Sequence, residues 1–396
     1  MIICPSKKCT GCAACAGVCP RKCITFSENE LGVLLPVVND SKCVACHKCQ
    51  QVCPNNNDPK FGYPIKCFAA WITDDIKRKE CASGGIGTAI AEYIIAENNG
   101  VVFGTAYDKN LMPRTILVDS INDVQKLKGS KYVQGIVDKE IYYDIKRYCD
   151  AGRRVAYIGL PCQIAGLLNF LGKGYDNLLT VDLICHGVCP ARYLKEEVEY
   201  LKGRYKIPDV SNIRFRGNDG NDFCLTLWDE KGNRVYNGDW WSHNRYFLGF
   251  MMGITLRENC YNCLYARPER VSDITIGDFI GLGAKIPFSY NTKNVSSVTV
   301  NTKKGEAFYI SLIASNSSIQ SIERDYSERL EYRPSLMEPF RRHKYNARFI
   351  ELCKRIGYRR AISSVLARFV FFSRLKGLVL SFVRKSRCLI ARVINF

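Results

Sequence analysis

A run of four cysteines that occurs twice near the N-terminus constrains this chain more than any other feature. The first copy is Cys9-x2-Cys12-x2-Cys15-x3-Cys19 before Pro20, and 34 residues later it recurs as Cys43, Cys46, Cys49 and Cys53 before Pro54. In such a run the first three thiolates point toward the inside of the loop that carries them. The fourth lies too far along the chain to join them. The repeat therefore predicts two loops that each wrap one inorganic centre and lend their last cysteine to the other.

Soft thiolate ligands in this number suit iron–sulfur clusters. Zinc would use only two thiolates of each loop and leave the third cysteine and the Cys-Pro without a role. The spacing resembles that of ferredoxin-type modules with two [4Fe–4S] clusters. We expect Cys4 and Cys23, which fall outside the pattern, to be unligated. We assign cluster one to Cys9, Cys12, Cys15 and Cys53, and cluster two to Cys19, Cys43, Cys46 and Cys49.

The remainder of the chain predicts three parts. Between the cysteine runs, residues 32–38 read as a short strand, and the Asn-rich segment before Pro59 breaks the chain, which gives a first domain over residues 1–58. From residue 60 strands and helices alternate, which favours a mixed α/β domain over residues 60–340. Residues 341–396 are basic and helical in pattern. The expected fold is an α+β ferredoxin-like module, then an α/β domain and a basic helical tail.

Individual elements follow from apolar runs bounded by Gly and Pro. We expect helices over residues 88–97, 161–171 and 191–202, and strands over residues 100–104, 155–159, 178–184, 223–228 and 295–300.

Composition and charge limit the classes of function. The 21 cysteines, without a secretory signal, favour metal binding in a reducing compartment, so we expect a cytoplasmic protein. The net charge is +19, but residues 341–396 hold 15 Lys or Arg against one acid, Glu351. A nucleic-acid-binding protein would carry its basic face on a folded domain, so this local excess argues against one.

The basic tail has its own pattern. Apolar residues recur at helical spacing between the arginines, and no apolar run approaches the ~20 residues that span a bilayer. A basic amphipathic helix can lie on an anionic membrane surface, here at the inner face of the membrane. The alternatives are a helix packed on the protein's own core or docked on a partner subunit. The apolar positions are Ile362, Val365, Leu366, Phe369 and Val370, continued by Leu375, Leu378, Val379 and Phe382.

Four further cysteines occur in three loops of the larger domain. Cys162 and Cys185 each follow a predicted strand, at the edge where α/β sheets place their sites, and Cys260 and Cys263 form a Cys-x2-Cys pair. Four thiolates would satisfy one more cluster. Buried free cysteines that only pack in a core are the alternative, and spacing alone leaves both open.

Residues 66–305 resemble the family that contains the beta subunit of deazaflavin-coenzyme hydrogenases and dehydrogenases. Seven segments carry the resemblance in the family's order. They are SGG at 83–85, GSKYVQ at 129–134, PCQ at 161–163, DLICHG at 182–187, CYNC at 260–263, SDITIGDF at 272–279, and the NT and Gly of 301–305. The chain departs from the family at Leu160, where Thr is usual, and at Ile280, where Trp is usual, which leaves the substrate open.

The resemblance implies an FAD-containing oxidoreductase with its own [4Fe–4S] cluster, held by Cys162, Cys185, Cys260 and Cys263. It places FAD near two segments, residues 83–85 and residues 129–134. The residues alone favour a plain turn and a helix cap over a flavin site, and no Gly-x-Gly-x-x-Gly fingerprint follows a strand. His186 and Asp278 are candidate catalytic or structural residues, and His186 could donate a proton. The FAD candidates are Ser83, Gly84, Gly85, Gly129, Ser130, Lys131, Tyr132 and Gln134.

These expectations combine into one function and one alternative. The chain is expected to pass electrons between a ferredoxin-type carrier and a small organic acceptor through three [4Fe–4S] clusters and FAD. The alternative is a non-catalytic electron-transfer subunit of a larger redox complex. Lysines and arginines around the cysteine repeat could steer an acidic carrier.

Overall fold

The computed structural model describes residues 1–96, 100–217, 223–332, 334–369 and 371–372. The N-terminal module pairs two short helices, α1 (Ala14–Val18) and α2 (Lys48–Gln51), with a hairpin of β1 (Ile24–Glu28) and β2 (Leu34–Val38). The sequence repeat is also a backbone repeat. Ala13 and His47, 34 residues apart, both take the left-handed conformation directly before a helix, with φ of 65° and 59°. This turn folds each cysteine loop back on itself.

The larger domain is built on one mixed sheet. In the described part of the chain its eight strands lie in the order β13-β3-β12-β11-β7-β6-β4-β5. The four strands β11, β7, β6 and β4 are parallel, and antiparallel strands flank them on both sides. The strands are β3 (Lys66–Ile72), β4 (Val101–Tyr107), β5 (Pro113–Val118), β6 (Val155–Gly159), β7 (Leu178–Leu183), β11 (Ile274–Asp278), β12 (Ser296–Val300) and β13 (Ile319–Arg324).

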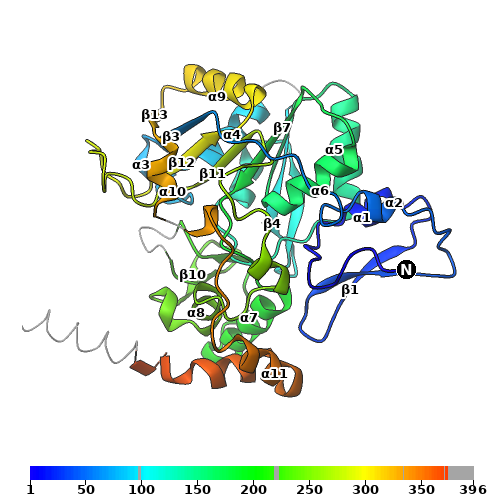
Figure 1. Ribbon diagram of the computed structural model, residues 1–396. Coiled ribbons are helices and arrows are strands. Elements are labelled where there is room, and N and C mark those ends of the chain that lie inside the picture. The colour runs from blue at the N-terminus through cyan, green and yellow to red at the C-terminus, as the bar shows by residue number, and fades with distance from the viewer. Residues whose placement is uncertain (97–99, 218–222, 333, 370, 373–396) are drawn as a thin grey trace, which may run out of the picture.

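Helices cover both faces of this sheet, as its continuous apolar strands require. Side chains alternate along β4, so that Val101 and Phe103 pack toward α5 (Lys139–Asp150) and α6 (Pro161–Leu171). Val102 packs on the other face with α4 (Ile86–Ala96) and α9 (Lys303–Ser315). Figure 1 shows α5 and α6 on the side of the N-terminal module. The shorter helices are α3 (Asp75–Lys79), α10 (Tyr326–Leu330) and the 3₁₀ turns η1 (Asn122–Leu127), η2 (Trp241–His243), η3 (Glu258–Asn262) and η4 (Pro334–Leu336).

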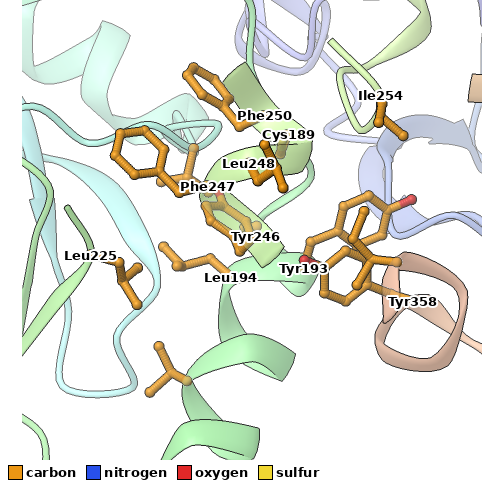
Figure 2. Close-up of a cluster of buried hydrophobic side chains, with 14 of the residues drawn as sticks. Cys189, Tyr193, Leu194, Leu225, Tyr246, Phe247, Leu248, Phe250, Ile254 and Tyr358 are labelled. Carbon is orange, nitrogen blue, oxygen red and sulfur yellow. The ribbon is translucent and has the colours of Figure 1, made fainter. Parts of the chain in front are cut away.

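A separate core lies beside the sheet, below it in Figure 1. It joins a three-stranded antiparallel sheet to helices α7 (Ala191–Tyr205), α8 (Arg245–Met251) and α11 (Asn346–Ile356). Figure 2 shows Phe247 and Phe250 of α8 in this cluster with Leu194 of α7. The small sheet consists of β8 (Asn212–Arg214), β9 (Thr226–Trp228) and β10 (Arg234–Asn237).

The first helical part of the basic tail belongs to this core. Residues 358–369 are helical, and the ring of Tyr358 stacks on that of Tyr193 with centroids 4.3 Å apart (Figure 2). Ile362 and Leu366 are fully buried. The apolar face that could have met a membrane is thus covered by the protein itself up to Phe369, which packs partly buried on the same core. Val370 and the apolar positions from Leu375 onward lie outside the described residues.

No helix among the described residues is long and apolar enough to cross a membrane.

Most expected elements are confirmed, and β6 matches its predicted range of 155–159. The strand expected over 223–228 is wrong at its start, since β9 begins only at Thr226. Phe223 has a φ of 61°, a left-handed conformation that no extended strand can contain.

The N-terminal module shares a core with the larger domain instead of hanging from a linker. Its residues Cys12 and Ala14 belong to the same buried cluster as Tyr142 of α5 and Leu167 of α6. The hydroxyl of Tyr142 donates a hydrogen bond of 2.6 Å to the carbonyl of Cys12. A Cβ on Gly166 would lie 2.8 Å from the Cβ of Cys12, so only glycine permits this approach.

We predict that Gly166→Ala weakens this contact. The added methyl group overlaps Cys12, and overpacking of this kind costs about 1–3 kcal/mol, more than the helix propensity gained. Gly174→Ala is the matched control, because a Cβ there meets no atom within 4 Å. Urea denaturation followed by tyrosine and tryptophan fluorescence measures both. Equal midpoints for the two variants would contradict the contact.

A second prediction concerns the C-terminal helix. Ile362→Ala should lower the free energy of unfolding by about 2–5 kcal/mol, because it empties a fully buried site. Ile356→Ala, at a position 41% exposed on the neighbouring helix α11, should change it by less than about 1 kcal/mol. Chemical denaturation of both variants measures the two changes in the free energy of unfolding. A loss at Ile362 no larger than that at Ile356 would show that the helix is not docked.

Candidate redox site

The structure brings together both fourfold cysteine sets of the N-terminal module. Each set lines a small cavity of its own. Residues of the β1–β2 hairpin or of the N-terminal segment close that cavity. Phe26 and Pro36 close the first cavity, and Met1 and Val38 close the second. The first is lined by Cys9, Cys12, Cys15 and Cys53, and the second by Cys19, Cys43, Cys46 and Cys49. The exchange of the fourth cysteine between loops thus follows from the fold.

The two sets differ in their access to solvent. All four thiols of the first set are at most 8% exposed, whereas Cys46 of the second set is exposed and Cys43 is half-buried. Exposed cations surround that second set, namely Arg21, Lys22, Lys42 and Lys48. The second set therefore lies at the surface, and the first lies against the larger domain.

The two extra cysteines contact these sets. The sulfur atoms of Cys23 and Cys19 lie 3.4 Å apart. Hydrogen bonds to Cys53 and Cys9 raise the pKa of the Cys4 thiol, and so favour its protonated form. Cys4 therefore lies in contact with two thiols of the first set.

The four cysteines of the larger domain line a third cavity, of about 430 Å³. Cys162 stands in the first turn of α6 after β6, Cys185 follows β7, and Cys260 and Cys263 lie in and just after η3. Among the described residues no three metal-binding side chains converge as a single ion requires. Four thiols are the ligand set that a four-iron cluster takes, and they line one cavity here.

Burial makes the thiols of this cavity weak acids. Burial raises the pKa of Cys162 well above its usual range, and the neighbouring thiols Cys185, Cys263 and Cys260 raise it further. Burial also raises the pKa of Cys260 to about 11. Four thiolates could coexist here only if a positively charged group neutralised them, as iron does.

Cavity three adjoins the first thiol set. Cys162 and Gly166 are one turn apart on the same face of α6, and Gly166 is the residue that receives Cys12. One helix therefore carries a thiol of the third set and seats the loop of the first.

A fourth cavity, of about 260 Å³, opens at the carboxyl ends of the parallel strands. Gly159 at the end of β6, Leu183 of β7 and Asp278 of β11 contribute to it. This edge is where open α/β sheets bind ligands. The third and fourth cavities share a wall, formed by Leu160, Gln163 and residues 185–188.

Six of the eight expected flavin-binding residues line the fourth cavity, together with Gly87 and Thr88 from the first turn of α4. Gly84 and Gln134 do not. The amide of Gly84 donates to the Ser296 hydroxyl, and Gln134 faces the third cavity. The six are Ser83, Gly85, Gly129, Ser130, Lys131 and Tyr132.

Charged groups in this cavity come from distant parts of the chain. Arg216 forms an ion pair of 3.0 Å with Asp278. Burial, and to a smaller extent Arg214, lowers the pKa of Lys131 to about 7, while its ammonium donates to the carbonyls of Leu127 and Lys128. Lys131 was expected from the sequence. Arg216 was not, since nothing local marks it as the partner of an aspartate 62 residues away.

His186 stands in the wall between the third and fourth cavities. Its ring lies between those of Phe340 and Phe250, at centroid distances of 4.2 and 4.8 Å. Its Nε2 lies 3.3 Å from the carbonyl oxygen of Phe250. The ring is thus held in place, as a positioned proton donor or a structural histidine would be.

Comparisons with known proteins agree with this arrangement. Residues 8–57 match the model of a 4Fe-4S dicluster domain. Residues 67–137 and 152–323 match the N-terminal and C-terminal models of the coenzyme F420 hydrogenase/dehydrogenase beta subunit, together more than half of the chain.

Two relatives illustrate the similarity. The chain is 30% identical over 204 residues to the coenzyme F420-dependent sulfite reductase of Methanocaldococcus jannaschii, a match to 50% of this chain and 30% of that protein. It also resembles a chain of the F420-reducing [NiFe] hydrogenase complex from Methanosarcina barkeri. There the identity is 17%, the coverage 78% of this chain and 93% of that chain, and the TM-score 0.41.

The ferredoxin-type cysteine repeat, the third thiol set at the sheet edge and the two matching family models lead to one conclusion. The chain is an iron–sulfur protein of the coenzyme F420 hydrogenase/dehydrogenase beta-subunit family.

Proposed function

We propose that the chain is an iron–sulfur flavoprotein oxidoreductase that passes electrons between a ferredoxin-type carrier and an organic acceptor, with three [4Fe–4S] clusters and FAD as cofactors. One observation carries the proposal. The cavity lined by Cys162, Cys185, Cys260 and Cys263 shares a wall with the cavity at the sheet edge. A cluster and a flavin in these two places would be neighbours, separated by the segment from Cys185 to Val188.

The surface position of the second thiol set supports its role as the contact with the carrier. Cys46 is exposed, and cations surround it. A basic rim attracts an acidic carrier and raises its association rate. All four thiols of the first set are buried, which suits an internal centre.

The residues of the fourth cavity fit a flavin dinucleotide. FAD, when bound, would supply the exchange between single electrons and a hydride. The amino end of α4, at Gly87 and Thr88, presents backbone N–H groups suited to phosphate, and Lys131 adds a cation. The volume of about 260 Å³ is below the usual range of about 300–1,000 Å³ for enclosed ligands, so part of the dinucleotide would lie outside.

The deazaflavin coenzyme is the first acceptor to test, because the family models and the archaeal relative carry its name. Anaerobically purified chain is mixed with a reduced ferredoxin and each of several acceptors, among them the deazaflavin coenzyme. Oxidation of the ferredoxin coupled to loss of the acceptor's absorbance supports the enzyme. Oxidation that occurs only when a second redox protein is added would support the non-catalytic subunit instead.

We predict that fully reconstituted protein holds about twelve iron atoms per chain and that Cys260→Ser holds about eight. The serine removes one ligand of the third set and leaves the N-terminal module intact. Cys189→Ser is the matched control, since Cys189 is equally buried but bonds to the Thr255 hydroxyl at 3.0 Å. Iron analysis counts the atoms. Eight atoms in the wild type would remove the third cluster from the proposal, and an equal loss in Cys189→Ser would remove Cys260 as its specific ligand.

We also predict that Lys131→Met weakens FAD binding about tenfold, because a charged hydrogen bond to phosphate is lost. The pKa of Lys131 is about 7, so its charge is present below pH 7 and lost above it. Wild-type protein should therefore bind FAD more tightly at pH 6 than at pH 8.5, and the variant should lack this pH dependence. Flavin fluorescence in an equilibrium titration measures both.

Lys126→Met provides the control for that titration. Lys126 is 59% exposed on η1 and pairs with Asp123, so its loss should leave FAD affinity unchanged. If Lys131→Met keeps both the affinity and the pH dependence of the wild type, Lys131 does not face the diphosphate.

A further inference from the structure

Arg257 is one of the most deeply buried charged side chains of the protein. It is 1% exposed and belongs to the loop that carries the third thiol set, where the amide of Cys260 donates to its carbonyl. Its side chain reaches the other way, and Nη2 donates a hydrogen bond of 2.8 Å to the carbonyl of Cys9. Nε donates to the Asn259 side chain at 3.1 Å. Arg257 therefore spans the third thiol set and the first.

Within the residues that the structure describes, this guanidinium has no carboxylate partner. Two other arginines of similar burial each have one, Arg216 at Asp278 and Arg270 at Asp182. In the same part of the chain, Nη1 of Arg257 is buried without any hydrogen-bond acceptor. An unpaired buried charge costs several kcal/mol, so a neutralising anion is expected beside it.

The nearest candidate anions are the two thiol sets. A four-iron cluster with four thiolate ligands is an anion whether oxidised or reduced. Arg257 is placed between the two sets by its hydrogen bonds. Its Nη2 donates to the carbonyl of Cys9 in the first set, and its own carbonyl accepts from the amide of Cys260 in the third.

We propose that Arg257 is the shared counter-ion of cluster one and the third cluster, and that its charge stabilises an added electron on either one. This inference rests on the proposed function, since it needs both clusters. A one-electron reduction adds one negative charge to a cluster and breaks no bond, and the reductant is the carrier or, in a titration, dithionite. The fixed positive charge raises both reduction potentials and so keeps two neighbouring centres matched.

The test is a redox titration of full-length, reconstituted Arg257→Gln, followed by electron paramagnetic resonance. Signals of the third cluster are those that Cys260→Ser removes. In Arg257→Gln the potentials of cluster one and the third cluster should each fall by at least about 59 mV, which is a tenfold change for one electron. Cluster two, at the surface, should keep its potential and serves as an internal reference. Arg342→Gln removes an exposed cation that pairs with Glu258, a residue of the same loop as Arg257. This change should shift none of the cluster potentials.

Asn259→Asp is a second variant that keeps Arg257 and its hydrogen bond. The new carboxylate would neutralise the guanidinium from 3.1 Å, with almost no change of shape. Asn259 also contacts Cys260, so the shift of cluster one is the diagnostic readout. If Arg257→Gln fails to assemble its clusters, Asn259→Asp alone tests the role of Arg257. A lowered potential of cluster one supports the counter-ion.

Two results separate the inference from the proposed function. Unchanged potentials of cluster one and the third cluster, in a variant that retains about twelve iron atoms, overturn the role of Arg257 and leave the three-cluster protein intact. A wild type that holds only eight iron atoms removes the third cluster itself, and the shared counter-ion fails with it.

Discussion

The contact between Cys12 and Gly166 is the constraint on which the rest of this structure depends. The missing side chain at Gly166 lets the first cysteine loop lie directly on α6, and Tyr142 fixes the loop from the neighbouring helix. Because Cys162 is one turn away on the same helix, this single close approach sets the first and third thiol sets side by side. Any larger residue at position 166 would separate them.

Outward and inward from that contact, the polar groups differ in their depth below the protein surface. Exposed lysines and arginines flank Cys46, the thiols of the first set are buried, and both inner cavities are lined by basic as well as acidic side chains. Most of the deeply buried charges are paired, as Asp182 is with Arg270. Low exposure makes each remaining charge count for more, because little water is present to screen it. Arg257, which has no carboxylate partner among the described residues, is therefore poorly screened where it lies between two thiol sets.

Local spacing predicted much of this site, and long-range contacts explain what it missed. The cysteine runs and the strand ends before Cys162 and Cys185 are short patterns, so their grouping could be predicted. Arg257 forms its key bond with Cys9, 248 residues away, and no local pattern marks such a residue. The tail shows a different limit. Helical spacing predicts that Ile362 and Leu366 share an apolar face, but not whether lipid or protein covers it.

The shared core of the two modules also changes how electrons meet the larger domain. A free ferredoxin must find its partner by diffusion, at a rate set by concentration and by salt. Here the partner is already bound, so the internal contact has a fixed geometry and an effective concentration that dilution cannot lower. In the proposed function, the encounter with a separate carrier takes place at the exposed end near Cys46. The protein thus confines ionic-strength dependence to its outer surface.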